Sequence, residues 1–401
     1  MRRLLAIPDA RTYLGGQALS MLGDSALWLA MGIWVKQLTG SSSAAGLTWM
    51  AFMAPQLAGP AAGLLADRIR RRSLLLAVNL AAAAIVLPLL LVRDEHDVWL
   101  VYAVMVAYGA ANAIIGAAQP GLLRTVVPDR LLPDANGLLQ TVREGLKLVA
   151  PLAGAGLFAA AGPSAVIVLD AATFLTAAAS LAAMRVREPR PQPTERHPLA
   201  EAADGIRHVW ATPLLRRLIA ACLVSVVGFG FCEATLFAVV DQGLHQPAPF
   251  LGVLMATQGA AAVIGGLAAA PVLRRIGEPR LTGAGLGLFA LACPLLATSH
   301  TGIVLSGSVL MGCGIPWTMV GLNTLLQRLT PLALQGRVYG AVDMIVAVPH
   351  VTSIAGGAVL VAALDHRLVL AAMAVLLAVG TVPLVTATAP ERTPARPVTT
   401  N

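Results

Sequence analysis

Twelve long apolar stretches, separated by short turns, run along nearly the whole chain. The hydrocarbon core of a bilayer requires about 20 apolar residues per helix, or about 25 when the helix is tilted. A barrel strand would need only about ten alternating residues, so stretches of this length predict membrane-spanning helices. The predicted spans are 12–37, 43–66, 73–92, 98–124, 134–160, 163–185, 213–240, 249–273, 280–298, 302–327, 337–363 and 366–387.

The composition supports an all-α integral membrane protein. Charged residues make up 12% of the 401 residues, whereas a soluble protein carries roughly 25%. The net charge of +8 does not indicate a nucleic-acid partner, because no soluble domain is left to present it. The four cysteines lie inside apolar stretches without metal-ligand spacing, so we expect no disulfide, no metal and no cofactor.

One longer polar segment divides the spans six and six. Its proline-rich beginning is typical of an extended linker, and residues 198–210 are predicted to form a short surface helix. The predicted domains are an N-terminal six-helix bundle, a cytoplasmic linker, a C-terminal six-helix bundle and a cytoplasmic tail. Their ranges are 1–185, 186–212, 213–388 and 389–401.

Basic residues predict the orientation of the spans. With a cytoplasmic N-terminus, 23 of the 28 lysines and arginines lie in cytoplasmic segments. Only Lys36, Arg93 and Arg367 then lie outside. Because cytoplasmic loops carry an excess of Lys and Arg, both termini are predicted to be cytoplasmic.

The two halves of the chain form an internal repeat. A shift of 203 residues aligns "GLLADRIRRR" at 63–72 with "GLAAAPVLRR" at 266–275, with five identities in ten. The same shift aligns 122–137 with 325–340. Two pseudo-symmetric six-helix bundles with a cavity between them are the arrangement this repeat implies, and that is a transporter layout.

Ionisable side chains within the spans are the candidates for proton coupling. Each costs at least about 2.5–3.5 kcal/mol on insertion scales, so each requires a partner or a purpose. Asp24, about twelve residues into the first span, is the strongest proton-binding candidate, and a fixed hydrogen-bonded carboxylate is the alternative. For Asp170, in the sixth span, we expect a structural role.

The fifth span carries a charge cluster. Arg143 and Lys147 share one helix face, with Glu144 three residues before Lys147. We expect an ion network with Asp24 or Asp343, and a net positive site for an anionic substrate is the alternative. The predicted proton-coupling residues are therefore Asp24, Glu144, Asp343 and Arg143.

Polar and aromatic residues on several spans could line an amphipathic substrate cavity. The candidates are Trp28, Asn112, Gln119, Glu233, Trp317, Asn323 and His350. No phosphate-binding loop of the GxxxxGK[ST] type and no catalytic constellation is recognisable in the sequence, so we do not expect an enzyme.

The turn between the second and third spans resembles the loop signature of the major facilitator superfamily. The first span, "VVPDRLLPDANGL" and "LQRLTPLALQGRVYGA" are similar to its branch of macrolide-efflux and siderophore-export proteins. The resemblance implies the major facilitator fold and transport by alternating access. One departure is Arg70, where the family usually has glycine. The residues of the turn that carry the resemblance are Gly63, Ala66, Asp67, Arg68, Arg71 and Arg72.

The position of Asp67 predicts a helix-capping role. It ends the second span where the positive N-terminus of span eleven is expected, so its carboxylate can cap N–H groups there. We expect Arg68, Arg71 and Arg72 to pair with it and with anionic lipid headgroups, forming a cytoplasmic gate. Ala270 corresponds to Asp67 in the second half, so only one side is expected to be held strongly. The alternative is that the arginines only set topology.

These patterns predict a secondary active transporter of the bacterial cytoplasmic membrane. We expect a monomer that exports a small amphipathic organic compound, such as a drug, antibiotic or siderophore, in exchange for protons. The alternatives are a proton-coupled importer and a transport-inactive scaffold or sensor of the same fold.

Overall fold

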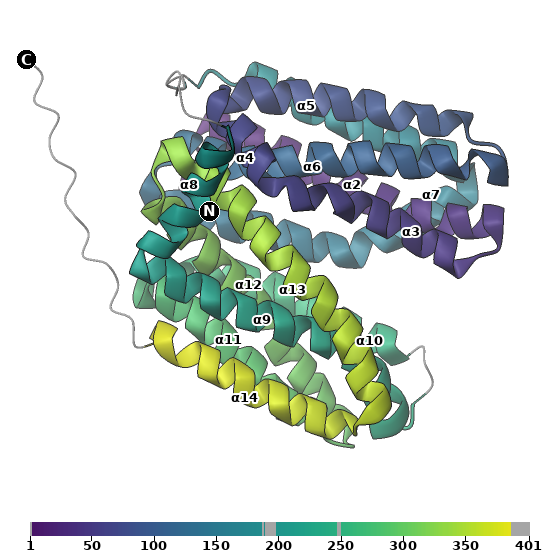
Figure 1. Cartoon of the computed structure of the whole chain (residues 1–401), viewed down its shortest axis with the longest axis vertical. Coiled ribbons are helices and arrows are strands. Elements are labelled where there is room, and N and C mark those ends of the chain that lie inside the picture. The colour runs from purple at the N-terminus through teal and green to yellow at the C-terminus, as the bar shows by residue number, and fades with distance from the viewer. Residues whose placement is uncertain (1, 187, 189–197, 247–249, 386–401) are drawn as a thin grey trace, which may run out of the picture.

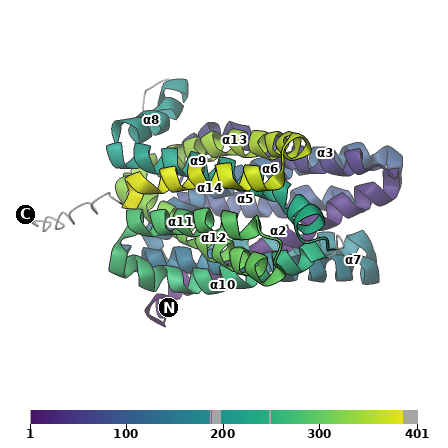
Figure 2. The same ribbon diagram turned by 90° about the horizontal axis from the view of Figure 1, so that it is seen from below.

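The computed structural model describes residues 2–186, 188, 198–246 and 250–385. Within these ranges the chain forms helices and turns and no β-strand (Figures 1 and 2). The α-helices are α1 Arg2–Leu5, α2 Pro8–Thr39, α3 Ser42–Met53, α4 Gly59–Arg68, α5 Arg71–Val86, α6 Val98–Val126, α7 Leu132–Ala183, α8 Pro198–Ala211, α9 Pro213–Ala238, α10 Phe250–Ile276, α11 Glu278–Leu296, α12 Thr301–Leu329, α13 Gln335–Ala363 and α14 His366–Val385.

The helices confirm the all-α membrane fold. Seven helical segments of the described chain are long and apolar enough to cross a bilayer by themselves. The predicted span boundaries differ from the helix ends by only a few residues, and α8 is the predicted surface helix. The second span differs, because a 3₁₀ turn at Ala54–Ala58 separates α3 from α4. Pro55 and Pro60 lack the N–H that a continuous α-helix needs there.

Helix α7 comprises the fifth and sixth predicted spans. It has 52 residues and reverses direction at Gly162, where φ is 75° and ψ is −180°. A residue with a Cβ rarely adopts this conformation, so glycine makes the tight reversal possible. The reversal returns the chain through the bundle and places Asp170 next to α2.

Each half of the chain has its own hydrophobic core. One cluster of buried residues runs from Leu4 to Met184, and a second runs from Val209 to Leu384. The N-terminal bundle (α1–α7) and the C-terminal bundle (α9–α14) are therefore packed separately.

The two bundles meet along α4 with α13 and along α7 with α10. Figure 1 shows them close together at the end of the molecule that carries α8, and diverging toward the opposite end. We call these the linker end and the far end. At the linker end lie the α4–α5 turn and the start of α13.

Candidate functional site

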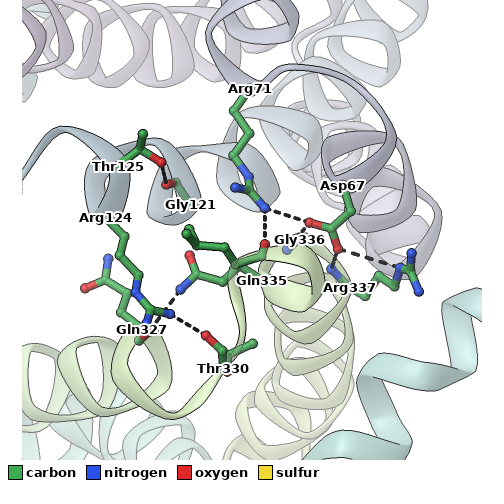
Figure 3. A network of polar contacts seen from close by, with 11 residues as sticks. Asp67, Arg71, Gly121, Arg124, Thr125, Gln327, Thr330, Gln335, Gly336 and Arg337 are labelled. Carbon is green, nitrogen blue, oxygen red and sulfur yellow. Dashed lines mark hydrogen bonds and ion pairs between the residues drawn. The ribbon is translucent and has the colours of Figure 1, made fainter. Parts of the chain in front are cut away.

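Asp67 joins the two bundles at the linker end. It lies in the last turn of α4, and its side chain is fully buried. Its carboxylate accepts hydrogen bonds from the backbone N–H groups of Gly336 at 2.9 Å and Arg337 at 3.0 Å (Figure 3). These N–H groups belong to the first turn of α13, which has no intrahelical acceptor for them. Asp67 therefore caps a helix of the opposite bundle, as the sequence predicts, and its charge favours the positive end of that helix.

Two arginines flank this carboxylate. Arg71 donates to Asp67 Oδ1 at 2.9 Å and also to the carbonyl oxygen of Leu332 in the C-terminal bundle. Arg337 places its Nε 3.7 Å from Asp67 Oδ2. We call Asp67, Arg71, Gly336 and Arg337 the Asp67 cluster. The sequence analysis missed Arg337, which becomes a neighbour of Asp67 only when the bundles meet.

The turn carries two further arginines of the predicted gate, Arg68 and Arg72. Arg72 donates to the carbonyl oxygens of Leu181 at 2.7 Å and Ala182 at 2.8 Å, in the last turn of α7. It therefore fixes the end of a helix within its own bundle. Arg68 is exposed at the end of α4.

Glycines allow the α4 and α13 backbones to come into contact beside Asp67. A Cβ added to Gly63 would lie 2.2 Å from the carbonyl oxygen of Gly336. One turn away, a Cβ on Gly340 would lie 2.0 Å from the carbonyl oxygen of Gly59. The sequence signal was present as GxxxG at 59–63 and 336–340, a spacing that permits close helix approach in membranes.

A second ion pair joins the bundles, at the crossing of α7 and α10. Arg274 of α10 donates to Asp134 of α7 at 2.9 Å. At the 203-residue shift, Arg274 corresponds to Arg71 and Asp134 corresponds to Arg337. The missing acid at Ala270 is therefore replaced by an acid on the partner helix. Each crossing therefore has an ion pair between the bundles. At the α4–α13 crossing the acid lies on α4, whereas at the α7–α10 crossing it lies on α7, the helix that corresponds to α13.

Amide side chains form a further connection at the linker end. Asn136 of α7 donates to Thr324 Oγ1 at 3.0 Å and to Gln327 Oε1 at 2.7 Å on α12. Arg124 of α6 donates to the carbonyl oxygen of Thr330 (Figure 3). Most of these residues lie in or beside the aligned segments 122–137 and 325–340. The sequence of either segment does not predict the contacts between them.

The charged residues of the spans are arranged in separate groups. Asp24 accepts a hydrogen bond from the Tyr108 hydroxyl at 2.7 Å, inside the N-terminal bundle. Glu144 is buried, and it accepts from Gln140 at 2.8 Å and pairs with Lys147 at 3.0 Å. Glu144 and Lys147, which are three residues apart on the fifth span, are thus paired with each other.

Asp343 and Arg143 face each other across the two bundles. Both side chains are exposed, and they interact electrostatically. Asp343 Oδ2 lies 3.7 Å from the position that a Cβ on Gly116 of α6 would occupy. Of the two partners expected for the fifth-span charges, the structure therefore places Asp343, and not Asp24, next to Arg143.

The predicted cavity residues occupy different environments. Trp28 is 40% exposed. Asn112 accepts from Gln56 at 3.5 Å within the N-terminal bundle, and Gln119 lies beside Tyr13. Trp317 donates to the carbonyl oxygen of Gly265 at 3.1 Å and so packs α12 against α10.

Asn323 is half-buried, and its carbonyl oxygen accepts from the Tyr339 hydroxyl at 3.1 Å. The side chains of Glu233 and His350 lie outside the described part of the structure. Within that part, no group of three or more His, Cys, Asp and Glu side chains is arranged to hold a metal ion.

The sequence is similar to those of known membrane transporters. The family model of the Major Facilitator Superfamily matches residues 13–351 and 234–400. An uncharacterised MFS-type transporter, YfiS of Bacillus subtilis (strain 168), is 27% identical over 368 residues, which cover 87% of this chain and 86% of that protein. Macrolide efflux protein A of Streptococcus pyogenes is 26% identical over 178 residues, 44% of each chain.

Solved structures share the fold at lower identity. The human organic anion transporter MFSD10 (TETRAN) superposes with a TM-score of 0.77 at 17% identity, covering 96% of this chain and 99% of that one. A bacterial homologue of the iron transporter ferroportin, in an outward-facing state, superposes with a TM-score of 0.76 at 15% identity, covering 94% and 98%.

Proposed function

Since the chain belongs to the major facilitator superfamily, we propose that this membrane transporter exports a small amphipathic organic compound in exchange for protons. The single observation that carries the mechanism is the Asp67 cluster, a buried charged contact between two separately packed bundles. Such a contact can break and re-form as a unit, which alternating access requires at one end of the molecule.

Export is favoured by the relatives that match part of the chain. Macrolide efflux protein A matches over 44% of its own length. Its name supports export as the direction of transport and a macrolide-like organic compound as the substrate class. Drugs, antibiotics and siderophores share the small amphipathic character that a cavity bearing Trp28, Asn112 and Trp317 would bind.

Proton coupling is assigned to the embedded charges. Asp24 inside the N-terminal bundle, and Asp343 facing Arg143 between the bundles, are the proposed exchange positions, while Glu144 is held by Lys147. A charge that faces the space between the bundles experiences a different environment when they rock, so its protonation can be linked to that motion.

The proposed setting is the bacterial cytoplasmic membrane, with both termini on the cytoplasmic side. The linker end then faces the cytoplasm, and the basic residues of the α4–α5 turn lie at the level of anionic headgroups. The paired linker end then corresponds to a protein closed toward the cytoplasm. We propose that a monomer carries out the whole cycle.

A substrate screen in everted vesicles tests this function. We expect an inside-acid pH gradient to drive uptake of one class among macrolides, other lipophilic drugs and siderophores, and a protonophore to abolish that uptake. Asp24→Asn should lose the dependence on the gradient, and Glu95→Gln, at an exposed position of the far end, should retain it. Gradient-driven movement in the opposite direction would indicate an importer, and binding without flux would indicate a scaffold or sensor. Either result contradicts the proposal.

A further inference from the structure

Two carboxyl side chains from different helices meet inside the N-terminal bundle. Asp24 lies on α2, and Asp170 lies on the second half of α7. Asp170 is fully buried, with 0% exposure, and neither of its carboxyl oxygens has a hydrogen-bond partner among the described residues. The hydroxyl of Tyr108, from α6, donates its only proton to Asp24 at 2.7 Å. That proton is therefore not available to Asp170.

Close helix packing brings the two carboxyl groups together. A Cβ on Gly23 would lie 2.7 Å from Asp170 Oδ1 and 2.1 Å from Thr173 Oγ1. The absence of a side chain at Gly23 thus leaves room for the Asp170 carboxyl group against the backbone of α2, next to Asp24. A larger residue at Gly23 would displace the Thr173 hydroxyl and the Asp170 carboxyl group.

Aromatic rings pack against Tyr108, the residue that donates to Asp24. The ring of Tyr108 lies 5.4 Å from that of Phe52 and 5.8 Å from that of Phe174, between their centroids. The Thr173 hydroxyl nearby donates to the backbone carbonyl oxygen of Asp170, so it does not replace the water that an ionised carboxylate loses on burial. Leaving a buried polar group unpaired is costly, and leaving a buried charge unpaired costs more.

The ionisable groups that interact with one another at this position are all acids. Asp24 and Asp170 interact electrostatically with each other and with Tyr108. Among the described residues, neither Asp24 nor Asp170 forms an ion pair with a basic side chain. Two ionised carboxylates would repel each other without compensation, and a single bound proton removes the repulsion.

We propose that Asp24 and Asp170 form one proton-binding site, in which Asp170 carries the proton and Asp24 exchanges it with water. Asp170 is fully buried and is therefore the inner member, whereas Asp24 is half-buried and is the member to which we assign the exchange with water. In the exchange step the Asp170 O–H bond breaks, the proton passes to Asp24, and Asp24 releases it to water. Asp170, which the sequence analysis treated as structural, thereby becomes a coupling residue. This assignment deepens the proposed proton-coupled transport and rests on it for its role in the cycle.

Infrared titration of the purified protein in lipid nanodiscs tests the site without any substrate. We expect a protonated carboxyl band at neutral pH in the wild type, which Asp170→Asn removes. Asparagine has the shape of a protonated aspartate and can stay buried. Tyr108→Phe keeps both acids and removes the donor to Asp24, so the band should remain and change frequency. Glu95→Gln, which alters an exposed acid, should leave the band unchanged.

Transport measurements separate this inference from the proposed function. We expect Asp170→Asn to bind substrate like the wild type, while the stimulation of its flux by a pH gradient falls at least tenfold. A wild type whose flux ignores the gradient but whose Asp170 band is present would overturn proton-coupled export and leave the proton site standing. A gradient-driven wild type, with an Asp170→Asn variant identical in both spectrum and coupling, would overturn the site alone.

Discussion

At the scale of single residues, Asp67 concentrates the interaction between the bundles. Its buried carboxylate receives two backbone N–H groups of α13 and the guanidinium of Arg71, so a single side chain satisfies donors from both halves. Opening the linker end would separate the carboxylate from the N–H groups of α13 and leave it with Arg71 of its own bundle. Asp67 is therefore positioned to affect the balance between two states more than the stability of either bundle.

Asp67→Asn should shift this balance toward an open linker end. Hydrogen bonds to a charged group are worth about 1.5–3 kcal/mol, and 1.4 kcal/mol is a tenfold change in an equilibrium. We expect the open fraction to rise roughly tenfold or more, as measured by the distance between spin labels at the exposed positions Ile69 and Leu332. Equal distance distributions and equal transport rates in variant and wild type would show that the turn only sets topology.

The Asp134–Arg274 pair should act in the same direction with a smaller effect. Arg274 is 50% exposed in its side chain, and exposed pairs contribute about 0.2–1 kcal/mol. We expect Asp134→Asn and Arg274→Gln each to raise the open fraction only a few-fold. In the double variant the effects should be less than additive, because both substitutions remove one interaction. Full additivity in the same spin-label measurement would mean that the two side chains act independently.

At the scale of elements, the crossing of α4 and α13 depends on glycines. The carbonyl oxygens of Gly59, Gly63, Gly336 and Gly340 occupy the space that side chains would need. Since the atoms in the way are backbone atoms, a side chain there can be accommodated only by moving a whole helix. The N–H groups of α13 reach Asp67 because this crossing is so close.

Gly63→Ala should separate these helices. Its methyl group would meet the Gly336 carbonyl oxygen, and overpacking of this kind costs about 1–3 kcal/mol. We expect a larger open fraction and slower transport. Gly32→Ala is the matched control, because no atom lies within 4 Å of its added Cβ. A wild-type label distance in Gly63→Ala would show that the glycine crossing is not required for closure.

The linker contributes acids to the same end. Glu188 accepts the N–H of Arg72 at 3.0 Å and so caps α5, and Asp204 of α8 lies 3.5 Å from Arg337. Burial raises the pKa of Glu188 above its ordinary value of 4.5, and the N–H of Arg72 partly offsets this. The folded protein therefore binds this proton more tightly than the unfolded chain does.

The raised pKa of Glu188 determines whether folding stability rises or falls with pH. The stabilisation from protonated Glu188 is fully present below its unfolded pKa of about 4.5, and it is lost as pH rises through the folded value. In Glu188→Gln, the unfolding temperature should depend less on pH above about 4.5 than it does in the wild type, as measured by tryptophan fluorescence. Glu95→Gln should keep the wild-type dependence. A Glu188→Gln profile parallel to the wild type would exclude this contribution.

At the scale of the whole molecule, both repeat turns lie at the linker end, where the bundles meet. The proposed mechanism requires the 63–72 and 266–275 turns to face the same side of the membrane, because both contacts must break together when that side opens. The exposed side chains Arg70 and Arg275 mark the two turns, and Arg93 marks the far end.

Single cysteines at these three positions, in a chain without the native cysteines, report the orientation. A membrane-impermeant maleimide should label the variants of Arg70 and Arg275 from the cytoplasmic side and the variant of Arg93 from the other side. Labelling of Arg70→Cys and Arg275→Cys from opposite sides would contradict the two-bundle mechanism and every role assigned to the linker end.

The sequence by itself determined the helices, the internal repeat of the two halves and the placement of Asp67 at the start of α13. Span length and turn chemistry are local properties, so they can be read from consecutive residues, as the agreement of α6, α12 and α13 with their predicted ranges shows. Tertiary structure alone decided the partners. Arg337 beside Asp67, Arg274 beside Asp134 and Asp170 beside Asp24 are pairs separated by more than a hundred residues. Their contacts depend on how helices cross, and amino-acid spacing does not encode that geometry.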